Sequence, residues 1–514
     1  MATINLTQPE AARPAESDNG FTSILGRNTT DAPAANDHPI SAALEPADLP
    51  LVVDLDGTLI YSDLLWECLL LFLKKHPLQA WRLPLWLLQG KAAFKARLAA
   101  AIEVDPATLL YDQALLVEIR AQREQGRPTI LATGSHRRVA DAVARHLQLF
   151  DEVHATDGAR NLTSHDKASE LVRCYGTKGF DYVGNARVDI PVWHHCRVAY
   201  SVARKSFDLG DGRSTEQIGD ARTRWGKPLL KAMRPRQWLK NLLVFVPMLA
   251  GHAVNATAFL QSLMAFVAFS LCASSAYLLN DALDAHDDRL HPTKRFRPIA
   301  AGTLPLPVAI GSSMLLAFLA LALSAAYDVL LLGAVAVYFL ATLSYSMYLK
   351  RLMMFDIVAL AMLYSMRILG GSAATHIEPS FWLLGFSFFV FLSLASLKRH
   401  SELVNLSRAG KGQTRGRGYN VDDRAPIGMI GVNSALMSVV VLMVYFNSAS
   451  VVLLYKTPVI LLGLVPLLVL WLGRLWMLSF RGEVNEDPVY YVSKDPISLV
   501  VGAGCVVLAV LASL

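Results

Sequence analysis

Two kinds of hydrophobic pattern divide the chain near residue 235. Before this point, short apolar runs at residues 51–55, 129–133 and 181–184 alternate with segments that have helical periodicity. Alternation of this kind predicts a parallel β-sheet covered by helices. After this point long apolar runs dominate, and runs of about 18 to 25 residues predict helices that span a membrane. The pattern therefore predicts two domains of different fold class.

The second part of the chain contains about nine apolar segments, which predict an all-α polytopic membrane bundle. The first segment is short for a span and contains Pro247, a residue that breaks or tilts helices. The segments cover residues 238–252, 257–279, 306–326, 328–348, 354–374, 380–397, 427–447, 457–478 and 497–514.

The domain boundaries follow from the changes in composition. Residues 1–47 are polar, rich in Ala, Pro and Asn, and without a period, which is typical of a disordered tail. We expect the α/β domain at 48–205, a linker at 206–232 and the membrane domain at 233–514.

Composition and charge narrow the class of partner. Hydrophobic residues make up 53% and charged residues 18% of the chain, and the net charge is +6. The Lys and Arg residues cluster beside the apolar runs, which favours phosphate-rich substrates and anionic membrane lipids over nucleic acid. The five cysteines form no CxxC pair, so neither a zinc site nor a disulfide framework is predicted. No N-terminal signal-like segment is found, so we expect the first half to stay in the cytoplasm.

Positive charge alternates between the connections of the apolar segments. Lys and Arg concentrate before the first segment and in every second connection after it, whereas the intervening connections carry almost none, Lys456 being the exception. Because positive charge marks the cytoplasmic side, this predicts an odd number of spans with the N-terminus inside. We therefore expect a multi-pass protein of the cell inner (cytoplasmic) membrane whose charged loops lie on the same face as the α/β domain.

An acidic stripe follows the second apolar segment. If that helix continues through residues 280–288, then Asp281, Asp284 and Asp288 fall within about 60° of one another. Carboxylates crowded in this way suit Mg²⁺, which also binds substrate phosphates. The block at 291–298 adds Lys294, Arg295 and Arg297 as phosphate-binding cations. The alternative interpretation is a solvated loop of mixed charge.

Acidic and basic residues recur together further along the chain. Tyr345, Lys350 and Asp356 surround one predicted loop, and Lys398, Arg399 and Glu402 form another cluster. Arg367 lies within a predicted span. An arginine at that depth faces a cavity or a partner, so it contacts either substrate or a helix-end carboxylate.

The motif NDxxDxxxD, formed by Asn280, Asp281, Asp284 and Asp288, resembles that of the UbiA superfamily of intramembrane transferases. The stretches at 234–241, 288–302, 345–350 and 416–420 resemble the decaprenylphosphoryl-5-phosphoribose synthases of that superfamily. This resemblance implies transfer of phosphoribose from phosphoribosyl diphosphate to a polyprenyl phosphate. Asp281 and Asp284 are the implied catalytic residues, and with Asp288 they are the implied Mg²⁺ ligands. The expected substrate-binding residues are Arg236, Lys240, Asn280, Lys294, Arg295, Arg297, Tyr345, Lys350, Asp356, Arg367, Lys398 and Arg399.

The sequence VVDLDGTL places Asp54 and Asp56 directly after a predicted strand. Two such carboxylates can meet one Mg²⁺ while one attacks a phosphoryl group. The stretch resembles the first motif of haloacid dehalogenase-type phosphatases, which implies a Rossmann-like domain with a helical cap at about 61–125. In this resemblance Asp54 is the nucleophile and Asp56 the general acid and base, and both contact the metal. Thr133 and Lys167 hold the phosphate, and Asp189 helps to hold Mg²⁺.

One position departs from the phosphatase pattern. Asn185 stands where the family has an acidic residue, and an amide brings no negative charge to a metal. A phosphatase fold that is inactive and serves for docking is therefore the alternative for this domain.

Fusion of the two halves predicts that the phosphatase removes the 5-phosphate from the transferred phosphoribose, which leaves polyprenylphosphoryl ribose. The main alternative is a prenyltransferase that moves a polyprenyl group from its diphosphate to an aromatic acceptor and needs the same Mg²⁺ stripe. A transporter or membrane scaffold is a further alternative, but its site would be expected near mid-bilayer, whereas the acidic clusters lie near predicted helix ends.

Overall fold

The computed structural model describes residues 49–514 except 158–159, 220–223, 409, 411–417, 449–450, 452–453 and 485–486. The expected tail at 1–47 lies outside the described residues, as do Gly416 and Arg417 of the stretch at 416–420.

The first domain is built on a six-stranded sheet with the order β3-β2-β1-β4-β5-β6. All its strand pairs are parallel, and its central strands are apolar because helices cover both faces. The strands are β1 (Leu51–Val53), β2 (Thr129–His136), β3 (Glu152–Thr156), β4 (Asp181–Gly184), β5 (Ala199–Ser201) and β6 (Glu216–Gln217). The α/β prediction is confirmed. The sheet extends into the expected linker, because β6 pairs with β5.

Helices connect the strands and form the expected cap. The connecting helices are α4 (Gln113–Glu124), α5 (Arg137–Leu147), α6 (His165–Tyr175) and α7 (Ile190–His195). The cap contains α1 (Leu64–Lys75), α2 (Arg82–Leu88) and α3 (Lys91–Ala101). Asp63 starts α1, since its side chain accepts hydrogen bonds from the backbone N–H groups of Leu65 and Trp66, as an N-cap residue does.

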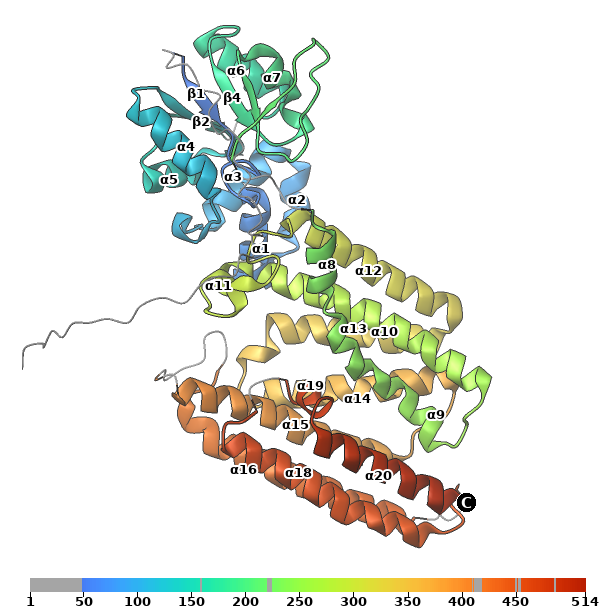
Figure 1. Ribbon diagram of the computed structural model, residues 1–514. Coiled ribbons are helices and arrows are strands. Elements are labelled where there is room, and N and C mark those ends of the chain that lie inside the picture. Colours follow the sequence, from blue (N-terminus) through green and yellow to red (C-terminus); the bar gives the residue numbers. More distant parts are fainter. Residues whose placement is uncertain are drawn as a thin grey trace, which may run out of the picture. The chain divides into compact units, whose positions relative to one another are not determined.

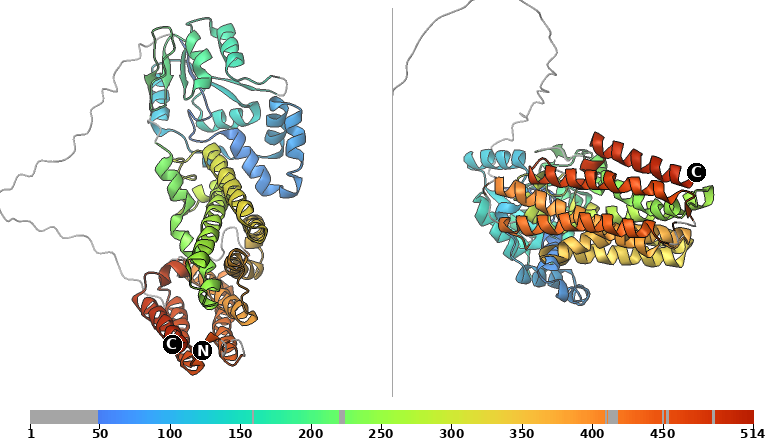
Figure 2. Two further views of the ribbon diagram at one scale, coloured as in Figure 1. Left: turned by 90° about the vertical axis from the view of Figure 1, so that its right-hand side faces the viewer. Right: turned by 90° about the horizontal axis from the view of Figure 1, so that it is seen from below.

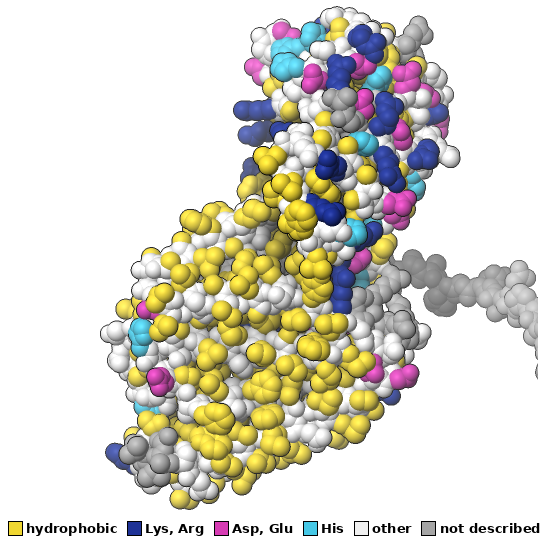
Figure 3. Space-filling view, turned by 180° about the vertical axis from the view of Figure 1, so that it is seen from behind, with side chains coloured by type: hydrophobic (Ala, Val, Ile, Leu, Met, Phe, Trp, Pro, Cys, Tyr) yellow, Lys and Arg dark blue, Asp and Glu magenta, His cyan; other side chains and the backbone are white. Residues whose placement is uncertain are grey.

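The second domain is a helical bundle (Figure 1). Within the described residues, eight helices are long and apolar enough to cross a membrane. On the face seen in Figure 3, hydrophobic side chains are spread over the helical part and charged ones are few there, whereas Lys and Arg gather on the α/β part. Such an exposed apolar surface suits lipid rather than water. The spans are built on α10 (Ala256–Leu283), α12 (Leu306–Tyr327), α13 (Val329–Met347), α14 (Phe355–Thr375), α15 (Phe381–Arg408), α16 (Arg424–Phe446), α18 (Leu464–Phe480) and α20 (Pro496–Ser513).

The apolar segment expected at 238–252 is not a regular α-helix. It consists of a 3₁₀ helix at Pro235–Phe245 followed by the short helix α9 (Val246–Ala250). A 3₁₀ helix rises about 2 Å per residue against 1.5 Å for an α-helix. The segment therefore extends on the order of 30 Å, close to the thickness of a bilayer core, although it is too short to span as an α-helix.

The cap helix α1 packs on the membrane domain. Leu70 belongs to one apolar cluster with Leu278, Ala282 and Ile299. In a buried ion pair, Glu67 of α1 contacts Arg289 at 2.6 Å. Arg289 ends α11 (Ala285–Arg289), the short helix after α10. Figure 2 shows two further views of the long helices of the bundle. Lys74, near the C-terminal end of α1, contacts Asp284. This end of the helix therefore lies against the aspartate motif, residues 280–288.

Candidate active sites

The first candidate site lies at the carboxyl ends of β1, β2 and β4. Asp54 follows β1, Thr133 and Ser135 lie at the end of β2, and Asp189 follows β4. Because β1 pairs with both β2 and β4, these residues converge at one edge, where open α/β sheets bind their ligands. The structure thus brings together the residues predicted for this site.

A buried chain of polar contacts joins Asp54 to Asp189. The Lys167 amino group donates to Asp54 Oδ1 at 2.7 Å and to the Tyr182 hydroxyl at 3.0 Å, and Tyr182 donates to Asp189 Oδ1 at 3.0 Å. Burial, together with the carboxylates of Asp189 and Asp56, raises the pKa of Asp54 to about 7 even though Lys167 opposes the shift. The site therefore holds more carboxylate charge than Lys167 alone compensates.

Asp56 is oriented by three donors. Its Oδ2 accepts hydrogen bonds from Thr133 Oγ1 at 3.1 Å and from Ser135 Oγ at 2.6 Å, and its Oδ1 accepts one from the backbone N–H of Leu64 at 2.8 Å. Lys95 of α3 lies near these groups and donates to the Gly134 carbonyl at 2.6 Å. The sequence reasoning missed Ser135, Tyr182 and Lys95. Only Ser135 had a local signal, since it follows Thr133 by two residues in a strand.

The carboxylates fit a divalent cation. Asp54 and Asp189 are buried and Asp56 is half-buried, and crowded carboxylate oxygens are the ligands that Mg²⁺ prefers. Asp189 Oδ2 already accepts the backbone N–H groups of Asn185 and Ala186 at 3.0 and 3.1 Å. The Asn185 amide lies over Gly57, where an added Cβ would come within 2.3 Å of Nδ2.

The second candidate site surrounds residues 280–298. The expected uninterrupted helix through this motif is wrong, because α10 ends at Leu283 and Asp284 separates it from α11. Asp281 and Asp288 nevertheless lie together, since one nitrogen of Arg297 is 3.1 Å from Asp281 and 2.7 Å from Asp288. Arg234 also contacts both carboxylate oxygens of Asp281, at 2.6 and 2.7 Å.

Asp284 lies between two lysines that are far apart in sequence. Its oxygens contact Lys350 at 2.7 Å and Lys74 of the cap helix at 2.8 Å. Although burial opposes the shift, these two cations hold the pKa of Asp284 below its ordinary value. Asn280 Oδ1 is 3.4 Å from Lys350. Neither Lys74 nor Arg234 was singled out as a site residue from the sequence.

The predicted second cluster forms a buried network. The Arg399 guanidinium contacts both oxygens of Asp356 and is 2.9 Å from the Tyr345 hydroxyl and 2.6 Å from Glu402. Tyr345 donates to Asp356 at 2.9 Å. Asp356 and Arg399 are almost fully buried, so these side chains position one another as a unit.

A third cluster centres on a residue that the sequence reasoning missed. Asp487, which caps α19 (Pro488–Val492), contacts Lys240 at 2.7 Å and Lys398 at 3.2 Å. Although burial opposes the shift, these lysines lower the pKa of Asp487. Lys240 and Lys398 were both predicted as substrate-binding residues, and both contact this carboxylate.

The remaining predicted residues have different surroundings. The Arg367 guanidinium is buried and donates to Asn241 Oδ1 and to the Tyr338 hydroxyl, both at 2.8 Å. Within the residues that the structure describes, Arg367 thus bonds to amide, hydroxyl and backbone oxygens, and the carboxylate considered as an alternative is not among its hydrogen-bond partners. Arg236 is exposed near the Tyr490 ring, Arg295 is exposed beside Phe296, and Lys294 is half-buried.

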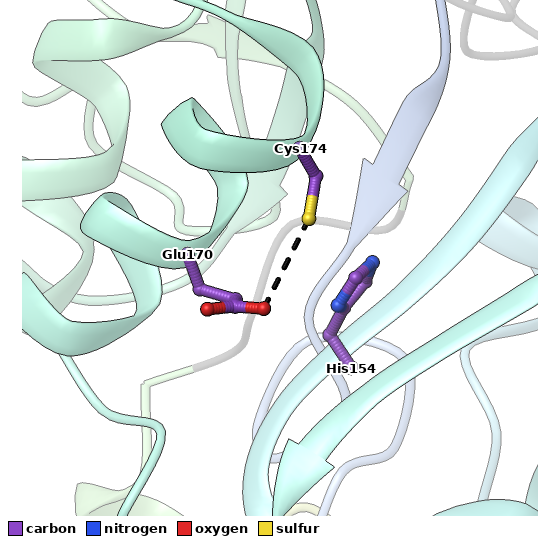
Figure 4. Close-up of side chains that lie close together, drawn as sticks. All are labelled: His154, Glu170 and Cys174. Carbon is purple, nitrogen blue, oxygen red and sulfur yellow. Dashed lines mark hydrogen bonds between the residues drawn. The ribbon is translucent and has the colours of Figure 1, made fainter.

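A further group of metal-ligand types lies on the α/β domain. His154, Glu170 and Cys174 have ligand atoms within 4.8 Å of one another (Figure 4). Glu170 is already held by Arg160 and Arg173, and His154 contacts the Tyr175 hydroxyl at 2.8 Å. Because these side chains have other partners, we assign no metal to this group.

Comparison with known proteins identifies both domains. Residues 244–492 match the UbiA prenyltransferase family, and residues 51–193 match the haloacid dehalogenase-like hydrolases. Uncharacterized protein y4nM of Sinorhizobium fredii is 34% identical over 88% of this chain and 89% of the relative. Decaprenyl-phosphate phosphoribosyltransferase of Corynebacterium glutamicum is 40% identical over 35% of this chain and 56% of the relative.

Among solved structures, a UbiA homolog from Archaeoglobus fulgidus bound to GPP and Mg²⁺ aligns with a TM-score of 0.42 and 15% identity, over 55% of this chain and 96% of that one. The expected two-domain fold and both resemblances are confirmed by the family matches and the close relative. The chain belongs to the UbiA prenyltransferase family and carries a haloacid dehalogenase-like domain on its N-terminal side.

Proposed function

We propose that the membrane domain is a Mg²⁺-dependent transferase that moves 5-phosphoribose from phosphoribosyl diphosphate to a polyprenyl phosphate at the cytoplasmic face of the inner membrane. One observation carries the proposal: Asp281, Asp284 and Asp288 each contact a Lys or Arg side chain. A site with both charges can hold a metal with its carboxylates and a diphosphate with its cations.

The reaction needs charge compensation and positioning. A phosphate oxygen of the lipid attacks C1 of the ribose, and the C1–O bond to the diphosphate breaks. A bound Mg²⁺, held by Asp281, Asp284 and Asp288, would stabilise the leaving diphosphate. Arg234, Arg297 and Lys350 form ion pairs with these carboxylates. When the metal and the substrate bind, the three side chains would contact the phosphates instead. The acceptor is already an anion, so alignment contributes more than deprotonation.

Two further clusters would complete the substrate site. Lys240 and Lys398 share the carboxylate of Asp487 and would bind a phosphate of either substrate. On substrate binding, the network of Tyr345, Asp356 and Arg399 would offer hydroxyl and carboxylate oxygens to the ribose hydroxyls. The relatives named decaprenyl-phosphate phosphoribosyltransferase support this donor and acceptor.

The N-terminal domain would then hydrolyse the 5-phosphate. Asp54 attacks the phosphorus, the bond between phosphorus and the sugar oxygen breaks, and Asp56 protonates that oxygen. Asp56 next takes a proton from the water that hydrolyses the aspartyl phosphate, and inorganic phosphate leaves. Thr133 and Lys167 would hold the phosphoryl group, and Asp189 would help Asp54 and Asp56 to hold Mg²⁺.

The test incubates the purified full chain with polyprenyl phosphate, phosphoribosyl diphosphate and Mg²⁺, and identifies the lipid product by mass. The expected product is polyprenylphosphoryl ribose, with release of diphosphate and phosphate. The Asp54→Asn variant should instead accumulate the phosphoribosyl lipid. If the protein consumes only prenyl diphosphates, the proposed donor is wrong.

A prenyltransferase is the second candidate, because the matched family carries that description and the same carboxylates and cations suit a prenyl diphosphate. The same incubation with a prenyl diphosphate and an aromatic acceptor distinguishes it. An inactive phosphatase fold remains the alternative for the first domain, and phosphate release by the wild type but not by Asp54→Asn would exclude it.

A further inference from the structure

A cavity of about 950 Å³ lies between the cap helix α1, helix α5 and the connections of the membrane domain. Its volume is in the range of small-molecule sites. One wall belongs to the α/β domain and the other to the membrane domain. Cationic side chains outnumber acidic ones in its lining, which has the cations Lys74, Lys75, Arg138, Arg145 and Arg351 and the carboxylates Glu103, Asp105 and Asp287.

Each wall of the cavity adjoins one candidate active site. On the membrane side, Lys74 contacts Asp284 at 2.8 Å and Asp287 at 2.7 Å. On the α/β side, Arg138 is the second residue of helix α5 and follows Ser135 by three residues, and the Ser135 hydroxyl donates to Asp56 at 2.6 Å. The cavity thus lies between the aspartate motif and the helix that follows the phosphatase strand.

Helix α1 sets the spacing of the two sites. The backbone N–H of Leu64, at its start, donates to Asp56, and Lys74, at its end, contacts Asp284. Ten residues of α-helix correspond to about 15 Å. Ion pairs and a shared apolar cluster hold the helix against the membrane domain, so this spacing is built into the docked structure.

Three arginines of the cavity are available to a ligand. Arg138 and Arg145 lie on one face of α5, because seven residues make almost two full turns of an α-helix. Both are exposed, as is Arg351 on the opposite wall. In the part of the chain that the structure describes, the ion pairs include no carboxylate partner for these three arginines. Arginines of this kind bind phosphate through paired N–H groups.

We propose that this cavity binds the phosphorylated sugar head group of the transferase product and presents it to the phosphatase site. The inference rests on the proposed function. The polyprenyl chain of that product stays in the bilayer, so only its charged head group needs to cross the gap between the sites. A basic cavity concentrates such an anion along this route.

The kinetic test compares R138E/R145E with R137E. Arg137 is also exposed on α5 but does not line the cavity, so R137E controls for a charge reversal on the same helix. We expect R138E/R145E to lower kcat/KM for hydrolysis of the phosphoribosyl lipid at least tenfold more than for p-nitrophenyl phosphate, and R137E to leave this ratio unchanged. R351E, on the other wall, should shift the ratio in the same direction.

A binding test separates this proposal from the proposed function. Ribose 5-phosphate is titrated onto the full-length wild type and both α5 variants by calorimetry. We expect about tenfold weaker binding to R138E/R145E and wild-type affinity for R137E. Equal affinities and equal kinetic ratios in the two variants would overturn the cavity proposal. If the wild type makes no phosphoribosyl lipid, the proposed function fails, and the titration still decides whether the cavity binds a sugar phosphate.

Discussion

The two candidate sites hold similar carboxylates but compensate their charge differently. In the α/β domain, Lys167 lies 2.7 Å from Asp54 and 4.0 Å from Asp189, whereas Asp56 accepts hydrogen bonds from uncharged donors. In the membrane domain, Asp281, Asp284 and Asp288 contact two arginines and two lysines. The first site therefore carries excess negative charge that attracts a metal. In the second site, each carboxylate is paired with a Lys or Arg side chain of the protein.

This difference reflects the surroundings of the sites. Carboxylates at the ends of parallel strands converge because of the sheet, and water or a metal can balance them. Near a bilayer an unpaired charge has a high free energy. In the membrane domain, Lys and Arg side chains therefore form ion pairs with the carboxylates of the site. A substrate that brings both diphosphate and metal can replace those pairs without leaving a charge unpaired.

The largest effect is expected for Asp54→Asn, which should remove one of the two activities and leave the other. Removing the proposed nucleophile should lower phosphate release from the phosphoribosyl lipid by at least about a thousandfold. Lipid labelling by phosphoribosyl diphosphate should stay within about twofold, because Asp54 belongs to the other domain. Radiolabelled donor and phosphate release measure the two activities on one preparation. A parallel loss of both would contradict two separate sites.

Asp281→Asn should have the opposite selectivity. The change keeps the shape but removes the charge that Arg234 and Arg297 contact, so transferase activity should fall roughly a hundredfold or more, as for other lost electrostatic groups. Hydrolysis of p-nitrophenyl phosphate should remain. Arg236→Gln, at an exposed arginine two residues from Arg234, provides a comparison and should lose less.

Lys74→Met tests whether the cap contributes to the membrane site. Asp284 would lose one of its two cations, and the lost charged hydrogen bonds should slow the transferase about tenfold. Lys91→Met, at an exposed lysine that begins α3, is the matched control. Equal transferase rates in the two variants would show that Lys74 is dispensable.

Asn185→Asp should give the smallest effect. An additional carboxylate near Asp189 should lower the Mg²⁺ concentration for half-maximal phosphatase activity roughly threefold to tenfold, because ligand charge tunes metal affinity. Phosphatase assays over a Mg²⁺ series measure this value, with transferase assays as the reference. An unchanged Mg²⁺ requirement would mean that residue 185 does not act on the metal.

The sequence predicted the elements whose signal is local. Period and run length identified the parallel sheet and the long helices, since each depends on neighbouring residues. The spacing in VVDLDGTL and in the motif at 280–288 identified the carboxylates of both sites. The broken segment at Pro235–Ala250 and the helix end at Leu283 were harder to predict, because packing decides whether a short apolar run stays α-helical.

By itself, the sequence determined the two-domain division and the acidic groups of each site. Only the tertiary structure decided which cations meet them. Lys74 contacts Asp284 across 210 residues of sequence and Lys240 contacts Asp487 across 247, whereas the sheet brings Tyr182 and Ser135 into the candidate site of the α/β domain. Charge pairing depends on distance in space, and distance between remote residues is set by how helices and strands pack rather than by spacing along the chain.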